Sequence, residues 1–184
     1  MMSETAKTKK KRKKDNHGNF SLVGPVTTDA VSSLTASMSR WARKPSNHDK
    51  PITLTICSEG GHVYAGLWLH DHLRMLSVQG HRVTTVIRGQ ATSIAGVIAQ
   101  AGDFRIIGAR SYLHLHEAAN LIHGKTHELR DEAAAQEELN QAVAELYAER
   151  SSLKAHQIHE KFERREWWVP AKEALALGFV DAIG

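Results

Sequence analysis

Residues 52–61 read ITLTICSEGG, an apolar run typical of a buried strand that ends directly in a glycine pair. A helical pattern follows at once, with apolar residues spaced from Val63 to Leu76, and a second strand-like run occupies residues 83–87. Strands that alternate with helices in this way usually pair in parallel, with the helices packed on the sheet. The order therefore predicts an α/β fold built from repeated β-α units.

The same alternation continues on both sides of this stretch. The further elements that we expect are a strand at residues 20–23, a helix that Thr27 or Thr28 caps and that runs to Trp41, a helix at 93–101, strands at 104–107 and 111–116, and a last helix at 170–177. Residues 128–153 differ, because they are rich in Ala and Glu and their polar surface is too wide for a core helix. We expect a long helix that protrudes from the domain and contacts another subunit, with a solvated surface helix as the alternative.

Positive charge is concentrated at the N-terminus. Residues 1–19 hold seven of the 24 Lys and Arg residues and only two of the 20 Asp and Glu residues. A run of like charges with few apolar side chains does not collapse. We therefore expect residues 1–19 to form a disordered Lys-rich arm, either a patch for a polyanion or a solubilising tail, and residues 20–184 to form one domain. Nothing in that near-neutral domain indicates nucleic-acid binding.

Composition also limits the location and the chemistry. Cys57 is the single cysteine of the 184 residues, which is typical of a reduced protein in the cytoplasm. No apolar stretch is long enough to span a bilayer, so we expect no association with a membrane. The 12 histidines form no convincing ligand set with Cys or Asp, and neither a metal nor another cofactor is expected.

Three separated fragments have the properties of a serine-hydrolase site. The glycine pair at residues 60–61 leaves backbone N–H groups available to an oxyanion, and Ser93 lies in a turn of small residues that opens a helix. A serine hydroxyl is a weak nucleophile until a neighbouring base takes its proton, and His116 at the end of a later strand is a suitable base. The fragments together predict acyl transfer at Ser93.

The chain from about residue 20 to residue 184 resembles the proteolytic subunit of the Clp protease, the ClpP family of serine peptidases. The family pattern Ser-Pro-Gly-Gly appears as SEGG at residues 58–61, and the nucleophile motif Gly-x-Ala-Ala-Ser-Met-Gly appears as GQATSIA at residues 89–95. The histidine strand matches at residues 111–116, and the C-terminal pattern matches as GFVD at residues 178–181. The resemblance implies a ClpP/crotonase-like fold.

The same resemblance implies a role for individual residues. Ser93 matches the nucleophile and His116 the general base, while the backbone N–H groups of Gly61 and Ile94 would form the oxyanion hole. The position of the family's catalytic aspartate falls on Glu166. Ser-His-Glu triads are a known variant of the Ser-His-Asp triad.

Several residues depart from the family pattern. Glutamate at position 166 is one methylene longer than aspartate, and the nearest alternative carboxylate is Glu163. Glu59 replaces the usual proline, Ala95 stands where glycine is usual, and residues 117–118 are Glu-Ala where a polar residue and proline are common. These departures keep open a catalytically silent ring subunit, and the basic arm keeps open a phage-type maturation peptidase. Acyl-CoA chemistry on the crotonase-like fold would not need both Ser93 and His116.

The resemblance also implies how the protein assembles. Family members form two stacked seven-membered rings around a chamber in which unfolded polypeptides are cut, and a separate Clp ATPase unfoldase feeds that chamber. The helix expected at residues 128–153 would form the contact between rings, and substrate would bind as an added strand along the stretch after His116. The Lys-rich arm stands where the family has its axial segment, so we expect it to alter unfoldase docking.

Overall fold

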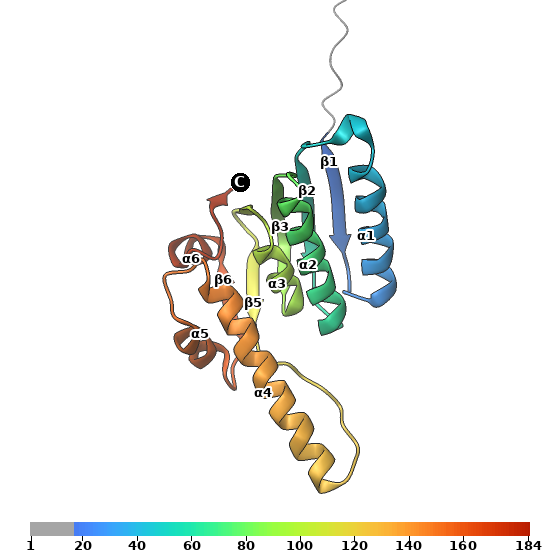
Figure 1. Cartoon of the computed structure of the whole chain (residues 1–184). Helices are drawn as coiled ribbons and strands as arrows, with labels where there is room; N and C mark the ends of the chain where they lie inside the picture. The colour runs from blue at the N-terminus through green and yellow to red at the C-terminus, as the bar shows by residue number, and fades with distance from the viewer. Residues whose placement is uncertain (1–16) are drawn as a thin grey trace, which may run out of the picture.

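The computed structural model describes residues 17–184, in which strands and helices alternate along most of the chain (Figure 1). The strands are β1 (Gly18–Val23), β2 (Ile52–Ser58), β3 (Val83–Thr92), β4 (Phe104–Ile107), β5 (Tyr112–Leu115), β6 (Trp167–Pro170) and β7 (Ala182–Ile183). The helices are α1 (Thr28–Ala42), α2 (Val63–Val78), α3 (Ile94–Gln100), α4 (Thr126–Ala148), α5 (Ala155–Phe162) and α6 (Ala171–Leu177), with a 3-10 turn at Pro45–Asn47.

These strands form one sheet in the order β1-β2-β3-β4-β7, and every neighbouring pair on that path is parallel. Strand β5 continues the sheet beside the last part of β3, and β6 pairs with β5 in the antiparallel direction. The prediction of an α/β fold with a largely parallel sheet is confirmed.

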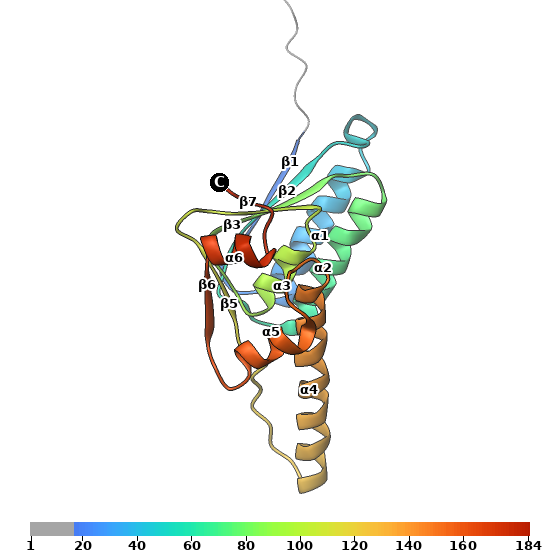
Figure 2. The same cartoon turned by 90° about the vertical axis from the view of Figure 1, so that its left-hand side faces the viewer.

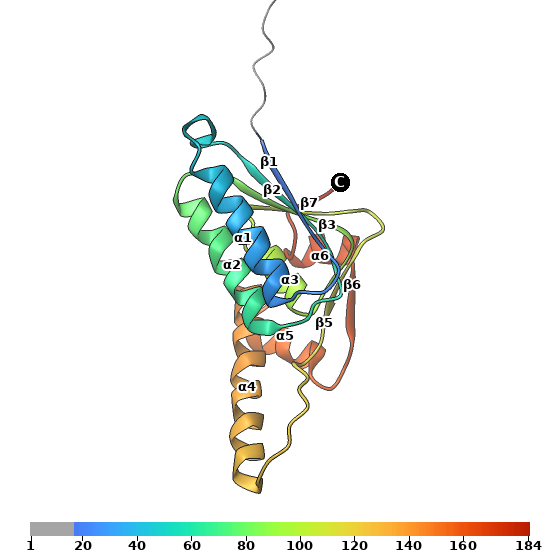
Figure 3. The ribbon, with the colours of Figure 1, turned by 90° about the vertical axis from the view of Figure 1, so that its right-hand side faces the viewer.

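Helices cover one face of strands β1–β3, as the two side views show (Figures 2 and 3). Strand β2 explains this arrangement, because Ile52, Leu54 and Ile56 alternate with threonines and are fully buried. They share one apolar core with Leu69 and Leu73 of α2. An alternating strand buries one face and leaves the other partly in solvent.

Strand β3 changes partners along its length, and this brings it to the candidate site. On one side, β2 accompanies it as far as Ala91. On the other side, its first half pairs with β4, whereas Gln90, Ala91 and Thr92 pair with β5. Gly89 lies between the two halves with a φ of 80°, a left-handed conformation that glycine adopts without steric cost. Ser93 follows directly at the end of the strand.

Helix α4 protrudes from the body of the molecule (Figures 1 and 2). Its buried residues are Asn140, Ala144 and Tyr147, all in its C-terminal half. The expected helix is therefore present, but it ends at Ala148 rather than at residue 153.

The structure differs from the sequence-based elements at four further places. Helix α5 and strands β6 and β7 were not expected, and β1 begins at Gly18, inside the segment assigned to the arm. Residues 1–16 of that predicted arm lie outside the described residues. None of the helices within residues 17–184 is long and apolar enough to cross a membrane.

Candidate active site

Ser93 occupies a sharp turn between β3 and α3. Its φ of 55° and ψ of −130° are unusual for a residue other than glycine. Backbone strain of this kind is found where a strand-to-helix turn presents a nucleophile. The Ser93 N–H donates to the carbonyl oxygen of His114 at 2.8 Å, which fixes the turn to the end of β5. Ser93 therefore lies in the kind of strand-to-helix turn that is expected around a nucleophile.

Two glycines pack closely around this turn. A β-carbon on Gly60 would lie 2.8 Å from the Ser93 β-carbon and 2.7 Å from the Thr92 carbonyl oxygen. A β-carbon on Gly61 would lie 2.5 Å from the Val26 carbonyl oxygen. Both glycines also have positive φ angles, of 89° and 144°. The glycine pair is thus required by its backbone conformation, by the close packing of Gly60 on Ser93 and by the close packing of Gly61 on Val26.

The N–H groups of Gly61 and Ile94 have no hydrogen-bond partner within residues 17–184. Gly61 forms a bridge with Val26, but that bridge uses the Gly60 carbonyl and the His62 N–H instead. Ile94 is the first residue of α3, where a helix leaves its N–H groups without an internal acceptor. Two donors are therefore available on the segments that meet at Ser93, as an oxyanion hole needs.

His116 lies just beyond β5 and is half-buried. Thr92 of β3 pairs with His114, so His116 is two residues further along the strand that borders the Ser93 turn. Its Nδ1 lies 2.6 Å from the carbonyl oxygen of Glu117. Because a carbonyl only accepts hydrogen bonds, Nδ1 carries the proton and Nε2 of the neutral ring keeps its lone pair. This is the tautomer that a general base for Ser93 requires.

Glu166 lies beside a different histidine. Its Oε2 is 2.5 Å from Nε2 of His114, although the angle departs from that of a linear hydrogen bond. The His114 side chain is buried, whereas the Glu166 side chain is 64% exposed. The alternative carboxylate, Glu163, lies 3.9 Å from the Arg164 Nε. The structure therefore brings neither carboxylate to His116.

His114 is the residue of the site that sequence reasoning did not assign to it. His114 and His116 are two positions apart on one strand and share a face, which is the signal available in the sequence. Their ring centroids are 5.3 Å apart. Burial lowers the pKa of His114, although the Glu166 carboxylate acts in the opposite direction.

A pocket of about 340 Å³ lies next to the glycine pair. Its lining comes from three segments, namely residues 61–64, residues 118–120, and the exposed side of α4 from Glu132 to Leu139. The Ala118 N–H donates to the Asn140 side chain at 2.9 Å, which anchors the start of this stretch to α4. Among the described residues, 117–125 have no strand partner. An extended segment that is not paired in a sheet is suited to bind a peptide as a neighbouring strand.

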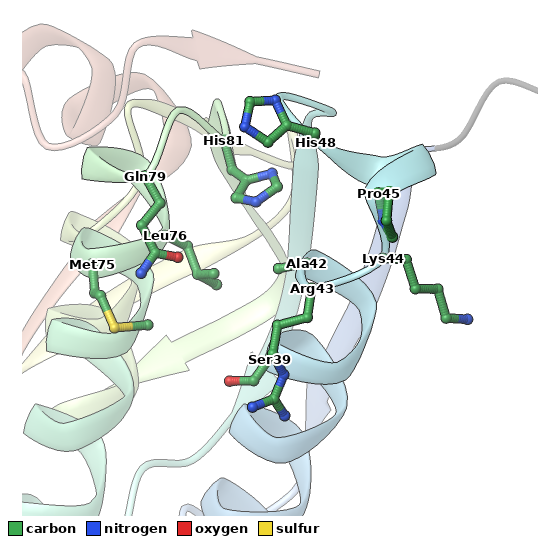
Figure 4. Close-up of a pocket in the computed structure, with 10 residues that line it drawn as sticks. All are labelled: Ser39, Ala42, Arg43, Lys44, Pro45, His48, Met75, Leu76, Gln79 and His81. Carbon is green, nitrogen blue, oxygen red and sulfur yellow. The ribbon is translucent and has the colours of Figure 1, made fainter.

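A second pocket, of about 530 Å³, lies at the C-terminal ends of α1 and α2 (Figure 4). Ser39 and Arg43 come from the first helix and its end, and Met75 and Gln79 from the second. No residue of the serine site lines it. Within residues 17–184, no group of three or more His, Cys, Asp or Glu residues could hold a metal ion.

Comparison with known proteins agrees with this geometry. The chain matches the family model for Clp protease over residues 7–184. It is 30% identical to an ATP-dependent Clp protease proteolytic subunit of Streptococcus gordonii over 167 residues, which cover 88% of this chain and 82% of the relative. It is 26% identical to the subunit of the same name from Deinococcus radiodurans over 161 residues, which cover 86% of this chain and 76% of the relative. The chain therefore belongs to the Clp protease family, and the prediction of a ClpP-type peptidase is confirmed.

Proposed function

We propose that this chain is a serine endopeptidase that cuts unfolded polypeptides with Ser93 as the nucleophile and His116 as the general base. The observation that carries the proposal is the strained Ser93 turn, packed against Gly60, with the free N–H groups of Gly61 and Ile94 beside it. Membership of the Clp protease family supports the same reaction class.

The reaction follows from the protonation states. His116 Nε2 takes the Ser93 proton while Oγ attacks the peptide carbonyl carbon, and the two free N–H groups stabilise the negative charge that develops on the carbonyl oxygen. The protonated His116 then gives its proton to the leaving amine, which leaves an acyl group on Ser93. A water molecule, deprotonated by His116 in the second half-reaction, releases the acyl group and restores the serine.

Glu166 is the proposed third member of the triad. A carboxylate on His116 Nδ1 would stabilise the imidazolium that forms during the reaction more strongly than the Glu117 carbonyl does. In the structure this carboxylate lies on His114. Activity with the full triad therefore requires a rearrangement of the Glu166 side chain.

We also propose that the protein works as a homo-oligomer of two stacked seven-membered rings in the cytoplasm and receives substrates from a Clp ATPase unfoldase. The relatives are named as proteolytic subunits of an ATP-dependent protease, which supports both assembly with other subunits and association with an ATPase. The protruding half of α4, which has no buried residue before Asn140, supports a contact between subunits.

Covalent labelling tests the proposed nucleophile. A fluorophosphonate probe should add one mass equivalent per chain to the wild type, and Ser93→Ala should remove the label completely. His116→Asn should slow the labelling by about 100-fold, because the serine loses its base. Ser21→Ala, which changes an exposed serine on β1, should label normally. Label on another residue, or label that persists in Ser93→Ala, would contradict the proposal.

A silent ring subunit is the second candidate, and the contact between Glu166 and His114 favours it. In that case Ser93 would resist the probe in an assembled ring, and adding a Clp ATPase would not change this. Labelling that begins only when the ATPase is added would instead identify a latent peptidase.

A further inference from the structure

His114 is held rigidly at the edge of the candidate site. Its ring stacks on Trp168 of β6, with ring centroids 3.9 Å apart and an angle of 4° between the planes. The two residues are also register partners in the β5–β6 pair. The His114 ring therefore has little freedom to change its orientation.

The carboxylate that contacts His114 is much less restrained. The Glu166 side chain is 64% exposed and lies just before β6 begins. The contact between Oε2 and Nε2 of His114 lacks the geometry of a hydrogen bond, so the carboxylate is held there by charge and proximity alone. Burial lowers the pKa of His114, and of the two neighbouring titratable groups the Glu166 carboxylate raises this pKa whereas His116 lowers it.

His116 meanwhile has a neutral partner. Its Nδ1 lies 2.6 Å from the Glu117 carbonyl, which orients the ring but brings no negative charge to it. The two rings are neighbours, with centroids 5.3 Å apart and planes inclined at 32°. In the structure the Glu117 carbonyl orients His116. A change of side-chain conformation at Glu166 would be needed for a carboxylate to orient it instead.

We propose that His114 is a positioning residue that holds the Glu166 carboxylate away from His116, and that full activation of Ser93 requires Glu166 to move from His114 to His116. The inference rests on the proposed function, because it concerns the third member of the same triad. No covalent bond changes in this step. The carboxylate leaves His114 and takes the place of the Glu117 carbonyl on Nδ1 of His116.

Protonation of His114 works against this exchange. A positively charged ring attracts the carboxylate more strongly than a neutral one does. We therefore expect the exchange to become easier as the pH rises and His114 loses its proton. His116 must also be unprotonated to act as a base, so the acid side of the pH–rate profile should involve two protons.

Four proteins test the proposal: the wild type, His114→Phe, Glu166→Gln and the double variant. Phenylalanine keeps a flat ring for the stack on Trp168 but has no nitrogen that could hold Glu166. If the active arrangement is a minor state of about 10%, His114→Phe should raise the labelling rate of Ser93 by about tenfold. It should also raise kcat more than it changes KM, and reduce the acid side of the pH–rate profile to one proton.

Glu166→Gln gives the decisive comparison. It should bring both backgrounds to the same slow labelling rate, so the loss should be about tenfold larger in the His114→Phe background than in the wild-type background. Glu160→Gln removes an exposed charge from the adjacent helix α5 and should change neither background. The proposal is wrong if His114→Phe labels no faster than the wild type, or if Glu166→Gln has the same effect in both backgrounds.

Imidazole NMR signals give a readout that does not depend on activity. In protein labelled with ¹³C at the histidine rings, Glu166→Gln should shift the His114 signal in the wild-type background and the His116 signal in the His114→Phe background. If none of the four proteins reacts with the probe, the proposed peptidase function fails. The NMR signals still test whether the Glu166 carboxylate moves from His114 to His116 in that case. A His116 signal that does not respond to Glu166→Gln in either background overturns the proposal.

Discussion

Gly60 and Ser93 pack so closely that a β-carbon on Gly60 would lie 2.8 Å from the β-carbon of Ser93. Carbon atoms that are not bonded do not approach to this distance, so any side chain at residue 60 displaces the nucleophile or the glycine loop. The positive φ of Gly60, 89°, adds a second reason for glycine at this position.

Gly60→Ala should therefore lower the rate of Ser93 labelling by about 100-fold or more, because a displacement of about 1 Å in a reacting group has an effect of this size. Gly24→Ala is the matched control. Gly24 has a similar φ of 81°, but a β-carbon there would meet no atom within 4 Å. It should lose about 1 kcal/mol of stability through backbone strain and keep its labelling rate. Equal losses of labelling in both variants would mean that backbone strain, not crowding of Ser93, is the cause.

The hydroxyl of Tyr147 gives a prediction about stability. Tyr147 is 1% exposed, and within residues 17–184 its hydroxyl has no hydrogen-bond partner. Burial raises the pKa of Tyr147, so the side chain stays neutral at ordinary pH. Tyr147→Phe should leave the free energy of unfolding unchanged or raise it by about 1 kcal/mol, since an unpaired buried hydroxyl is unfavourable.

Gly96 makes this prediction sharper, because a β-carbon on Gly96 would collide with the Tyr147 hydroxyl. Gly96→Ala should lower the free energy of unfolding by about 1–3 kcal/mol through overpacking, and Tyr147→Phe should restore part of that loss. Denaturant unfolding of both single variants and the double variant measures the coupling. If Tyr147→Phe alone lowers the free energy of unfolding by more than about 1 kcal/mol, the hydroxyl has a hydrogen-bond partner in the assembled protein.

Much of the fold was predictable because single segments carry strong local patterns. Residues 52–57 form an apolar run that predicted a strand, and the strand β2 covers them, although its threonine side is only partly buried. Thr27 was one of the two predicted caps of the first helix, and its side chain accepts a hydrogen bond from the Ala30 N–H at 3.2 Å. The Ser93 turn was likewise expected from small residues that follow a strand and open a helix.

The region after α4 was not predictable in the same way. Helix α5 has eight residues and buries only Ile158 and Phe162, so its apolar pattern is too short to distinguish it from a continuation of α4. Strand β6 has four residues, and its position depends on pairing with β5, a contact across more than 50 residues. The contact between Glu166 and His114 depends on that same pairing, whereas the resemblance to the family implied that Glu166 lies on His116.

The ion pair between Arg105 and Asp181 should be important for stability. Arg105 is 2% exposed, and two of its guanidinium nitrogens donate to the Asp181 carboxylate at 2.8 and 3.1 Å. Asp181→Asn would leave a buried guanidinium without its counter-charge and should lower the free energy of unfolding by about 3 kcal/mol. Asp71→Asn, in which the exposed partner of His70 is neutralised, should change it by less than about 0.5 kcal/mol. Similar small changes in both variants would show that Arg105 finds another partner or water.

Stability should fall in two steps as the pH is lowered. Burial lowers the pKa of His72 and of His114 in the folded protein. Burial by itself would raise the pKa values of Asp103 and Asp181, but their hydrogen bonds and arginine partners lower both below the usual range. In each case the unfolded chain binds more protons than the folded one, so the free energy of unfolding rises with pH.

The histidine contribution should be lost as the pH falls through about 6.5, and the carboxylate contribution as it falls below about 4. Denaturant unfolding from pH 8 to pH 3 at one protein concentration, with the assembly state followed in parallel, measures both steps. His72→Gln should make the upper step smaller. A free energy of unfolding that stays constant between pH 7 and pH 5 would contradict the assignment of that step to the histidines.

Leu129 tests whether α4 forms the contact between rings. It is 40% exposed and lies on the protruding half of the helix, before the first buried residue at Asn140. If this face packs on another ring, Leu129→Lys places a charge in an apolar contact and should raise the dissociation constant of the stacked assembly by at least about tenfold. Leu175→Lys is the matched control, since Leu175 is 41% exposed but lies on α6. Sedimentation or native mass spectrometry measures the assembly. Dissociation by Leu175→Lys and not by Leu129→Lys would assign the interface to α6 and leave α4 as a solvated helix.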